Sequence, residues 1–156
     1  MMMHEVCQMM LSDISKKQIA TLAGEDSVQK AAQKMRDRNV GSIVVVNAQQ
    51  HPVGIVTDRD IVVQVVAKSA DPSSQTVADI MSRDLLILRA SDSLQEAARR
   101  MDEKCVRRAP VVDEQGALCG LIALDDVLIL LSQCLSECAE LIKKQAKCEG
   151  VETEGA

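Results

Sequence analysis

The sequence predicts a mixed α+β fold made of two copies of one unit, each ordered strand, helix, strand, strand, helix. The first observation is a repeat: twelve of the 36 residues from 26 to 61 are identical to the residue 66 positions later, as in the pair Gly54 and Gly120. The second is that the hydrophobic period changes in the same order in both copies. The third is an apolar content of 47% in 156 residues, enough for one compact core. A duplicated unit is therefore the predicted basis of the fold.

In the first copy, Asp26 and Ser27 are good caps for a helix, because Val28, Ala31 and Met35 follow at helical spacing. The segment 41–47 is rich in β-branched residues, which indicates a buried strand. The expected elements are a strand at 19–22, a helix from 26 to 39, a strand at 41–47, a turn at 48–51, a strand at 52–56 and a helix at 57–68.

The second copy predicts the same order. The polar, proline-bearing segment 69–75 is too short to separate independent domains, so the copies are expected to pack about a pseudo-twofold axis. The last helix is expected to continue to about Lys147 with an apolar stripe that suits packing on the second copy or on a second chain. The stripe consists of Leu128, Leu131, Leu135, Cys138 and Leu141 or Ile142. The expected elements are a strand at 85–88, a helix at 93–104, a strand at 109–113, a turn at 114–116, a strand at 118–122 and a helix from 125.

These elements divide the chain into two repeats with short flanking segments. Apolar runs such as Ile43–Val46 are far shorter than the roughly 20 residues that cross a bilayer, and no secretory signal is evident at the first residues. The sequence therefore predicts a cytoplasmic protein with no membrane partner. The predicted boundaries are a leader at 1–10, repeat 1 at 11–68, a connector at 69–76, repeat 2 at 77–135, a helical extension at 136–147 and a disordered tail at 148–156.

Composition excludes several classes of function. A net charge of −5 and the absence of Phe, Tyr and Trp disfavour nucleic acid, which needs basic clusters and stacking platforms. The six cysteines form no C-x-x-C pair and only two histidines are present, so the sequence predicts reduced thiols and no metal site. No set of residues suggests an acid, a base and a nucleophile placed together, so no catalytic residue is predicted and the protein is not expected to be an enzyme.

One segment, Gly54–Asp60, carries a candidate binding chemistry. It joins a buried strand to a helix start and places the hydroxyl of Thr57 three residues before the carboxylate of Asp60. Free backbone N–H groups and a hydroxyl at a helix start attract phosphate, and a carboxylate one turn away accepts ribose hydroxyls. The glycine allows close approach of a backbone or a ligand. The same residues also fit a capping box, in which Thr57 and Asp60 only stabilise the helix start.

Together with the repeat, the segments Gly54–Ile61, Gly120–Val127 and Val106–Asp113 resemble the motifs of a CBS-domain pair, also called a Bateman module. The resemblance covers about residues 11–135. It implies that the two units form one disc-like half and that two pairs associate, here as a homodimer. It also implies that clefts between the units bind adenine nucleotides or other adenosyl ligands.

Carried over by position, the resemblance assigns ribose hydroxyls to Asp60 and phosphate to Thr57, with Arg108 of the other copy as a charge-assisted donor. Adenine would be held by aliphatic contacts and backbone hydrogen bonds, because the chain has no aromatic residue. The nucleotide-binding residues that the resemblance implies are Ala20, Val40, Gly41, Thr57, Asp60 and Arg108.

A second, weaker site is implied in the other cleft. Ala123 stands where the first copy has Thr57 and cannot donate to phosphate, although Asp126 is retained. We therefore expect one competent site per chain and one weak or empty one. The residues implied for the weaker site are Leu86, Val106, Arg107 and Asp126.

The function that these features predict is a non-catalytic energy or metabolite sensor. An adenosyl ligand would shift the packing of the paired units and signal through rearrangement of the dimer to a regulated protein, which the sequence does not identify. AMP is the favoured ligand, with ADP, ATP and NAD as alternatives, because Thr57 and Arg108 both favour phosphate. The alternative hypothesis is a ligand-independent dimeric interaction scaffold.

Overall fold

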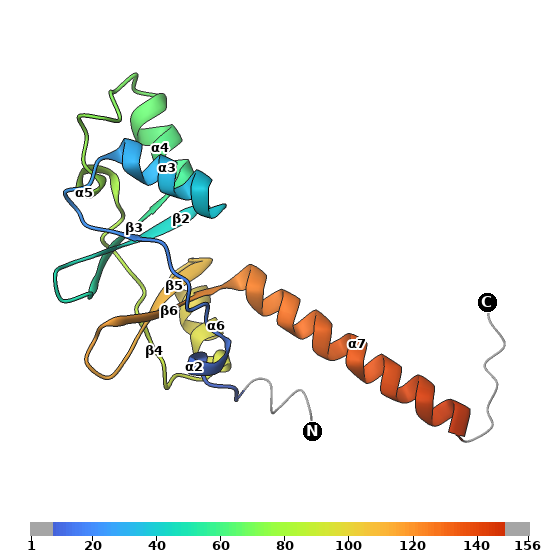
Figure 1. Cartoon of the computed structure of the whole chain (residues 1–156). Coiled ribbons are helices and arrows are strands. Elements are labelled where there is room, and N and C mark those ends of the chain that lie inside the picture. The colour runs from blue at the N-terminus through green and yellow to red at the C-terminus, as the bar shows by residue number, and fades with distance from the viewer. Residues whose placement is uncertain (1–7, 149–156) are drawn as a thin grey trace. The chain divides into compact units, whose positions relative to one another are not determined.

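A computed structural model describes residues 8–148, and within that range it contains two three-stranded sheets with helices beside them (Figure 1). The predicted α+β class and the element order of both repeats are confirmed. The elements are α2 (Leu11–Ile14), β1 (Thr21–Leu22), α3 (Val28–Arg38), β2 (Ser42–Val46), β3 (Pro52–Thr57), α4 (Asp58–Ile61), η1 (Val62–Val66), α5 (Val77–Ile80), β4 (Leu88–Arg89), α6 (Leu94–Glu103), β5 (Arg108–Val112), β6 (Leu118–Ala123) and α7 (Leu124–Cys148).

The sheet of repeat 1 has the order β1-β2-β3. β1 runs parallel to β2, and β2 pairs antiparallel with β3 in a register that places Ser42 opposite Thr57. All five residues of β2 are buried, because this central strand lies between covered faces. The register therefore fixes the start of β2 beside the end of β3, where the candidate site was predicted.

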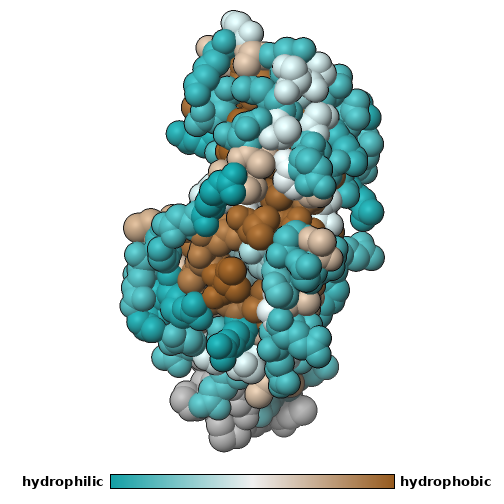
Figure 2. All heavy atoms as spheres, turned by 90° about the vertical axis from the view of Figure 1, so that its left-hand side faces the viewer, coloured by the Kyte–Doolittle hydropathy of each residue, from teal (hydrophilic) through white to brown (hydrophobic). Residues whose placement is uncertain are grey.

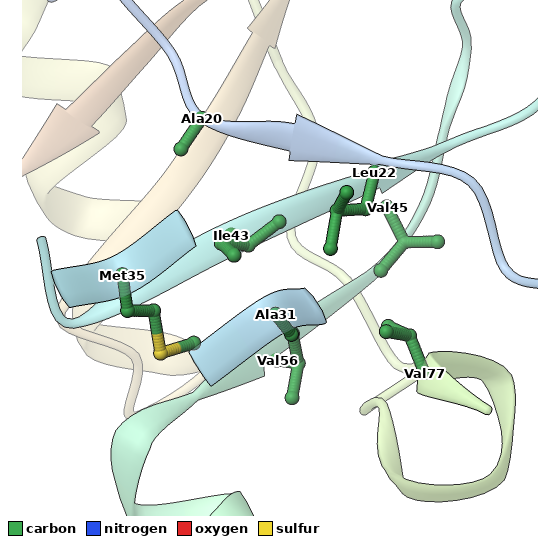
Figure 3. Packing of buried hydrophobic residues seen from close by; sticks show 8 residues of the cluster. All are labelled: Ala20, Leu22, Ala31, Met35, Ile43, Val45, Val56 and Val77. Carbon is green, nitrogen blue, oxygen red and sulfur yellow. The ribbon is translucent and has the colours of Figure 1, made fainter. Parts of the chain in front are cut away.

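Helix α3 begins and ends where its caps allow. The Ser27 hydroxyl accepts a hydrogen bond from the backbone N–H of Lys30 at 3.2 Å, and Asn39 ends the helix in the left-handed conformation at φ 52°. Ala31 and Met35 turn toward the sheet and join a core cluster with β1, β2, β3 and α5 (Figure 3). The cluster consists of Ala20, Leu22, Ala31, Met35, Ile43, Val45, Val56 and Val77.

Repeat 2 forms the sheet β4-β5-β6 with the same local rules. β4 runs parallel to β5, with Leu88 opposite Val111. Ser93 caps α6 by accepting from the N–H of Glu96 at 3.2 Å, and Ala97 and Met101 are buried on the inner face of α6. The caps and buried positions of α3 and α6 thus recur 66 residues apart.

The two repeats exchange the segments that precede their first strands. The segment that contains α5 packs on repeat 1, where Val77 N–H donates to the carbonyl of Asp26 at 2.8 Å. The segment that contains α2 packs on repeat 2, where Leu11 N–H donates to the carbonyl of Asp92 at 3.0 Å. Two isolated bridges continue this exchange, Ile55 with Ser82 and Lys16 with Leu121. Each repeat is therefore completed by a segment that lies before the other one in the chain.

Two features of the helices differ from the sequence expectation. The helix predicted over 57–68 is α-helical only at Asp58–Ile61 and continues as a π-helix at Val62–Val66. Four of those five π-helical residues are valine, and β-branched side chains crowd the preceding helical turn. The four-residue helices α2 and α5 were not predicted at all, because so short a helix shows no 3.6-residue periodicity in the sequence.

Helix α7 belongs to a separate compact unit that begins at Ala123. It is 25 residues long, which agrees with the predicted extension of the last helix to about residue 147. No helix within residues 8–148 is long and apolar enough to cross a membrane. The predicted leader up to residue 7 and the predicted tail from residue 149 lie outside the described residues.

Candidate functional site

Thr57 and Asp60 form a capping box at the start of α4. The backbone N–H and the hydroxyl of Thr57 both donate to Oδ2 of Asp60, at 2.8 and 2.7 Å, and the N–H of Asp60 donates to the Thr57 hydroxyl oxygen at 3.2 Å. Oδ1 of Asp60 accepts no hydrogen bond from the residues that the structure describes. One oxygen of this carboxylate thus remains available for a ribose hydroxyl, while the Thr57 proton is already donated.

The other N–H groups at the start of α4 are also occupied. Asp58 N–H donates to the carbonyl of Gly41 at 3.1 Å, and Arg59 N–H donates to the Asp58 carboxylate at 2.8 Å. The free N–H groups expected at this helix start are therefore already bonded within the chain. A phosphate at this position would depend on side chains, or on rotation of the Thr57 hydroxyl away from Asp60.

Gly41 lies directly beside this helix start. A Cβ atom at Gly41 would lie 3.2 Å from Oδ2 of Asp58, so the glycine keeps this corner open. Val40, which precedes it, is 37% exposed, and Ala20 is buried at the entry to β1. The carbonyl of Ala20 accepts from Val44 N–H at 3.0 Å, so sheet pairing already uses it. The fold thus brings Gly41 to the start of α4, and an adenine near Ala20 would rely mainly on aliphatic contacts.

Arg108 is the first residue of β5 and is half-buried. Its guanidinium makes no hydrogen bond or ion pair with any residue between 8 and 148. Other arginines of repeat 2 are paired, for example Arg100 with Asp92 at 3.1 Å and Arg99 with Glu96 at 2.8 Å. A partly desolvated guanidinium without a carboxylate partner is a strong donor for an anion.

The residues predicted for the weaker second site lie before β4, before β5 and in the first turn of α7. Leu86 is buried before β4, and Val106 is half-buried, with its N–H bonded to the carbonyl of Met101 at 3.0 Å. Arg107 is exposed, and Asp126 lies in the first turn of α7. Because an alanine, Ala123, precedes α7, no hydroxyl is available at the position that Thr57 occupies before α4.

Gly54 is in close contact with the side chain of Met81. A Cβ atom there would lie 2.8 Å from Cγ of Met81, so the glycine makes room for a side chain of the exchanged segment. Met81 packs against the core of repeat 1 together with Ile80. Sequence reasoning missed this contact because nothing in the local pattern shows that residues 76–82 return to repeat 1.

Two cavities lie at equivalent places in the repeats, and neither is lined by the predicted nucleotide-binding residues. The cavity of repeat 1 has a volume of about 410 Å³ and includes Leu22, Lys34 and Val46 in its wall. The cavity of repeat 2 has a volume of about 850 Å³ and includes Ile87 and Arg100. Figure 2 shows exposed apolar residues between hydrophilic ones on one face of the molecule. Among the described residues, no group of three or more His, Cys, Asp or Glu side chains could hold a metal ion.

A second capping box on α5 repeats the geometry of Thr57 and Asp60 away from the candidate site. Thr76 donates through its N–H and its hydroxyl to Oδ2 of Asp79, at 2.8 and 2.7 Å. These hydrogen bonds, first that of the hydroxyl, hold the pKa of Asp79 below its usual value. A capping box of this type therefore requires no ligand, and the box on α4 alone does not identify a binding site.

Comparison with known proteins places the chain in a family. The CBS domain matches residues 11–67 and 77–133. The uncharacterized protein MK0525 of Methanopyrus kandleri is 31% identical over 134 residues, which cover 86% of this chain and 68% of that protein. The CBS domain-containing protein YhcV of Bacillus subtilis is 35% identical over 119 residues, covering 76% and 83%. The chain belongs to the CBS-domain family and contains a pair of these domains.

A solved structure shares the fold. The CBS domain pair of protein MJ0100, in complex with 5′-methylthioadenosine and S-adenosyl-L-methionine, matches with a TM-score of 0.71. The match covers 80% of this chain and 97% of that chain, at 23% sequence identity. The predicted CBS-pair architecture is thus confirmed at the level of the fold.

Proposed function

We propose that this protein is a non-catalytic regulatory module that binds an adenine nucleotide beside the start of α4. Two observations carry the proposal: Oδ1 of Asp60 accepts no hydrogen bond from the described residues, and the half-buried guanidinium of Arg108 has no partner among them. A carboxylate accepts ribose hydroxyls and a guanidinium donates to phosphate, so the two groups suit opposite ends of a nucleoside phosphate. The shared fold with a pair that holds adenosyl ligands supports this ligand class.

The ligand would replace part of the capping box. The Thr57 hydroxyl donates to Asp60 in the structure, so it would donate to phosphate only after rotating about its Cα–Cβ bond. The carboxylate keeps its bond from the Thr57 N–H during this rotation. Because Arg108 must provide most of the phosphate binding, we propose AMP as the preferred ligand, with ADP, ATP and NAD as alternatives.

The regulatory step would arise because the ligand binds some arrangements of the two repeats more tightly than others. A ligand that touches repeat 1 through Asp60 and repeat 2 through Arg108 stabilises one arrangement of the repeats over others, by the difference in its affinity for them. We propose that this shift passes through a cytoplasmic homodimer to a regulated protein. The competing proposal is a ligand-independent dimeric scaffold, which is supported by the capping box of the same geometry on α5.

A thermal-shift titration with AMP, ADP, ATP, NAD and S-adenosylmethionine tests the proposal. A ligand at one hundred times its dissociation constant adds about 2.7 kcal/mol to the free energy of unfolding, which raises the Tm of a chain of this size by roughly 5–10 °C. We expect at least one of the compounds to give this rise. Asp60→Ala should abolish it, and Arg108→Gln should reduce it for AMP but not for adenosine.

The control variant is Asp79→Ala, which removes the same capping geometry from α5. Both alanine variants should lose about 1 kcal/mol of stability without ligand, because each removes a helix cap. Only Asp60→Ala should lose the ligand response. No rise with any compound, or the same response in both variants, would favour the scaffold.

A further inference from the structure

Helix α7 carries a heptad pattern from residue 124 to residue 142. Its apolar residues alternate at spacings of four and three, and this 3.5-residue period is the one that keeps a seam facing a second helix. The pattern covers about 27 Å, because each residue of an α-helix rises 1.5 Å. The seam is formed by Leu124, Leu128, Leu131, Leu135, Cys138 and Ile142.

Most residues of this seam are exposed in the structure, whereas Leu131 and Cys138 are half-buried. Leu128 is 58% exposed, Leu135 is 64% exposed and Ile142 is 66% exposed. A single helix with such a face is marginally stable in water, and most helical stability comes from packing of the apolar face. The 25-residue length of α7 therefore indicates that another surface covers the seam.

Asp125 lies on one flank of the seam in the first turn of α7, and after that turn the flanks carry no charge. On one side lie Val127, Cys134 and Leu141, and on the other side lie the small residues Ser132 and Ala139. The charged residues after position 127 lie on the opposite face, where Lys143 and Glu140 form an ion pair at 2.8 Å. A partner helix with charged flanks would find no complementary charge here, whereas an identical helix presents the same neutral, apolar surface.

We propose that the seam of α7 pairs with the seam of α7 in a second copy of this chain. Knobs-into-holes packing requires a partner helix with the same period, and the chain itself supplies that helix. After the first turn, self-pairing brings no like charges together along the seam or its flanks. The seam uses neither Asp60 nor Arg108, and its part after residue 133 lies outside the residues that match the CBS domain, so the pairing does not rest on the ligand proposed above.

Cross-linking between differently labelled copies tests the pairing. The full-length protein is prepared in ¹⁴N and ¹⁵N forms, mixed, and treated with a short bis-maleimide that links neighbouring thiols. Cys134 and Cys138 of α7 are both free thiols. We expect mass spectrometry to find mixed ¹⁴N–¹⁵N links between these cysteines. Leu135→Glu should lower their yield at least tenfold, because it places a charge in the seam, and Ile142→Glu should act in the same way.

The matched control is Gln133→Glu, which adds the same charge to the polar face of the same helix, two residues from Leu135. Its yield of mixed links and its helix content by circular dichroism should both equal those of the unchanged protein. Links confined to single copies, or mixed links that Leu135→Glu leaves unchanged, would overturn the proposal.

Discussion

The two repeats share their scaffold but differ at the residue that precedes their last helix. In repeat 1, Thr57 caps a short helix and Asp60 closes a capping box. In repeat 2, the equivalent residue is Ala123, and a 25-residue helix follows it. The contacts that build the two sheets recur 66 positions apart, so the sheets form equally well with Thr57 or with Ala123 before the last helix. The comparison indicates that only repeat 1 combines a hydroxyl and a carboxylate at the start of its last helix, whereas repeat 2 continues into an extended helix.

The exchanged segments make equivalent backbone contacts in both repeats but differ in some side-chain contacts. Val77 and Leu11 occupy equivalent positions, are fully buried and donate equivalent backbone hydrogen bonds. Further along each segment the side chains differ: Met81 packs against Gly54, whereas Ser15 packs against Gly120. The backbone exchange is thus common to both repeats, while the fit at each glycine is particular to one.

The largest expected effect is on the segment that completes repeat 2. Leu11→Ala should lower the free energy of unfolding by about 2–5 kcal/mol, because it removes a fully buried side chain and leaves a cavity. Urea unfolding measures the loss. Met10→Ala is the control on the same segment, since Met10 is 52% exposed and its loss should cost under about 0.5 kcal/mol. Equal costs for the two variants would mean that α2 does not pack on repeat 2.

A smaller effect should distinguish the two glycine contacts. Gly120→Ala should cost about 2–3 kcal/mol, because the new Cβ would lie 2.9 Å from Cβ of Ser15, which is close to the backbone and cannot move away. Gly54→Ala should cost nearer to 1 kcal/mol, because its neighbour Met81 is long and flexible. Urea unfolding of both variants checks the order, and a larger cost for Gly54→Ala would contradict it.

The smallest expected effect restores the hydroxyl that repeat 2 lacks. Ala123→Thr should raise the number of ligands bound per chain from one toward two in a calorimetric titration with the nucleotide that stabilises the protein. One added hydrogen bond is worth about 1 kcal/mol, or roughly a fivefold gain in affinity at the weaker site. Ala123→Val, which adds similar volume without a hydroxyl, is the control. Unchanged stoichiometry in Ala123→Thr would count against the proposed difference between the sites.

Several features of the chain were predictable because they depend on local physics. The repeat and the change of hydrophobic period gave the element order, and Ser27 and Ser93 marked helix starts that the structure confirms. The spacing of Thr57 and Asp60 predicted a capping box, which the structure contains. Caps and amphipathic faces are settled within a few residues, so the sequence alone carries them.

What the sequence alone determined is therefore the duplicated α+β unit, its strands and long helices, and the residue types available at each helix start. Only the tertiary structure decided that residues 11–16 complete repeat 2 and residues 76–82 complete repeat 1, and that the N–H groups at the start of α4 are already bonded. These outcomes depend on backbone hydrogen bonds between segments distant in the chain, such as that from Leu11 to Asp92. The hydrophobic pattern and the residue types of either segment do not indicate such distant partners, so the sequence alone does not predict them.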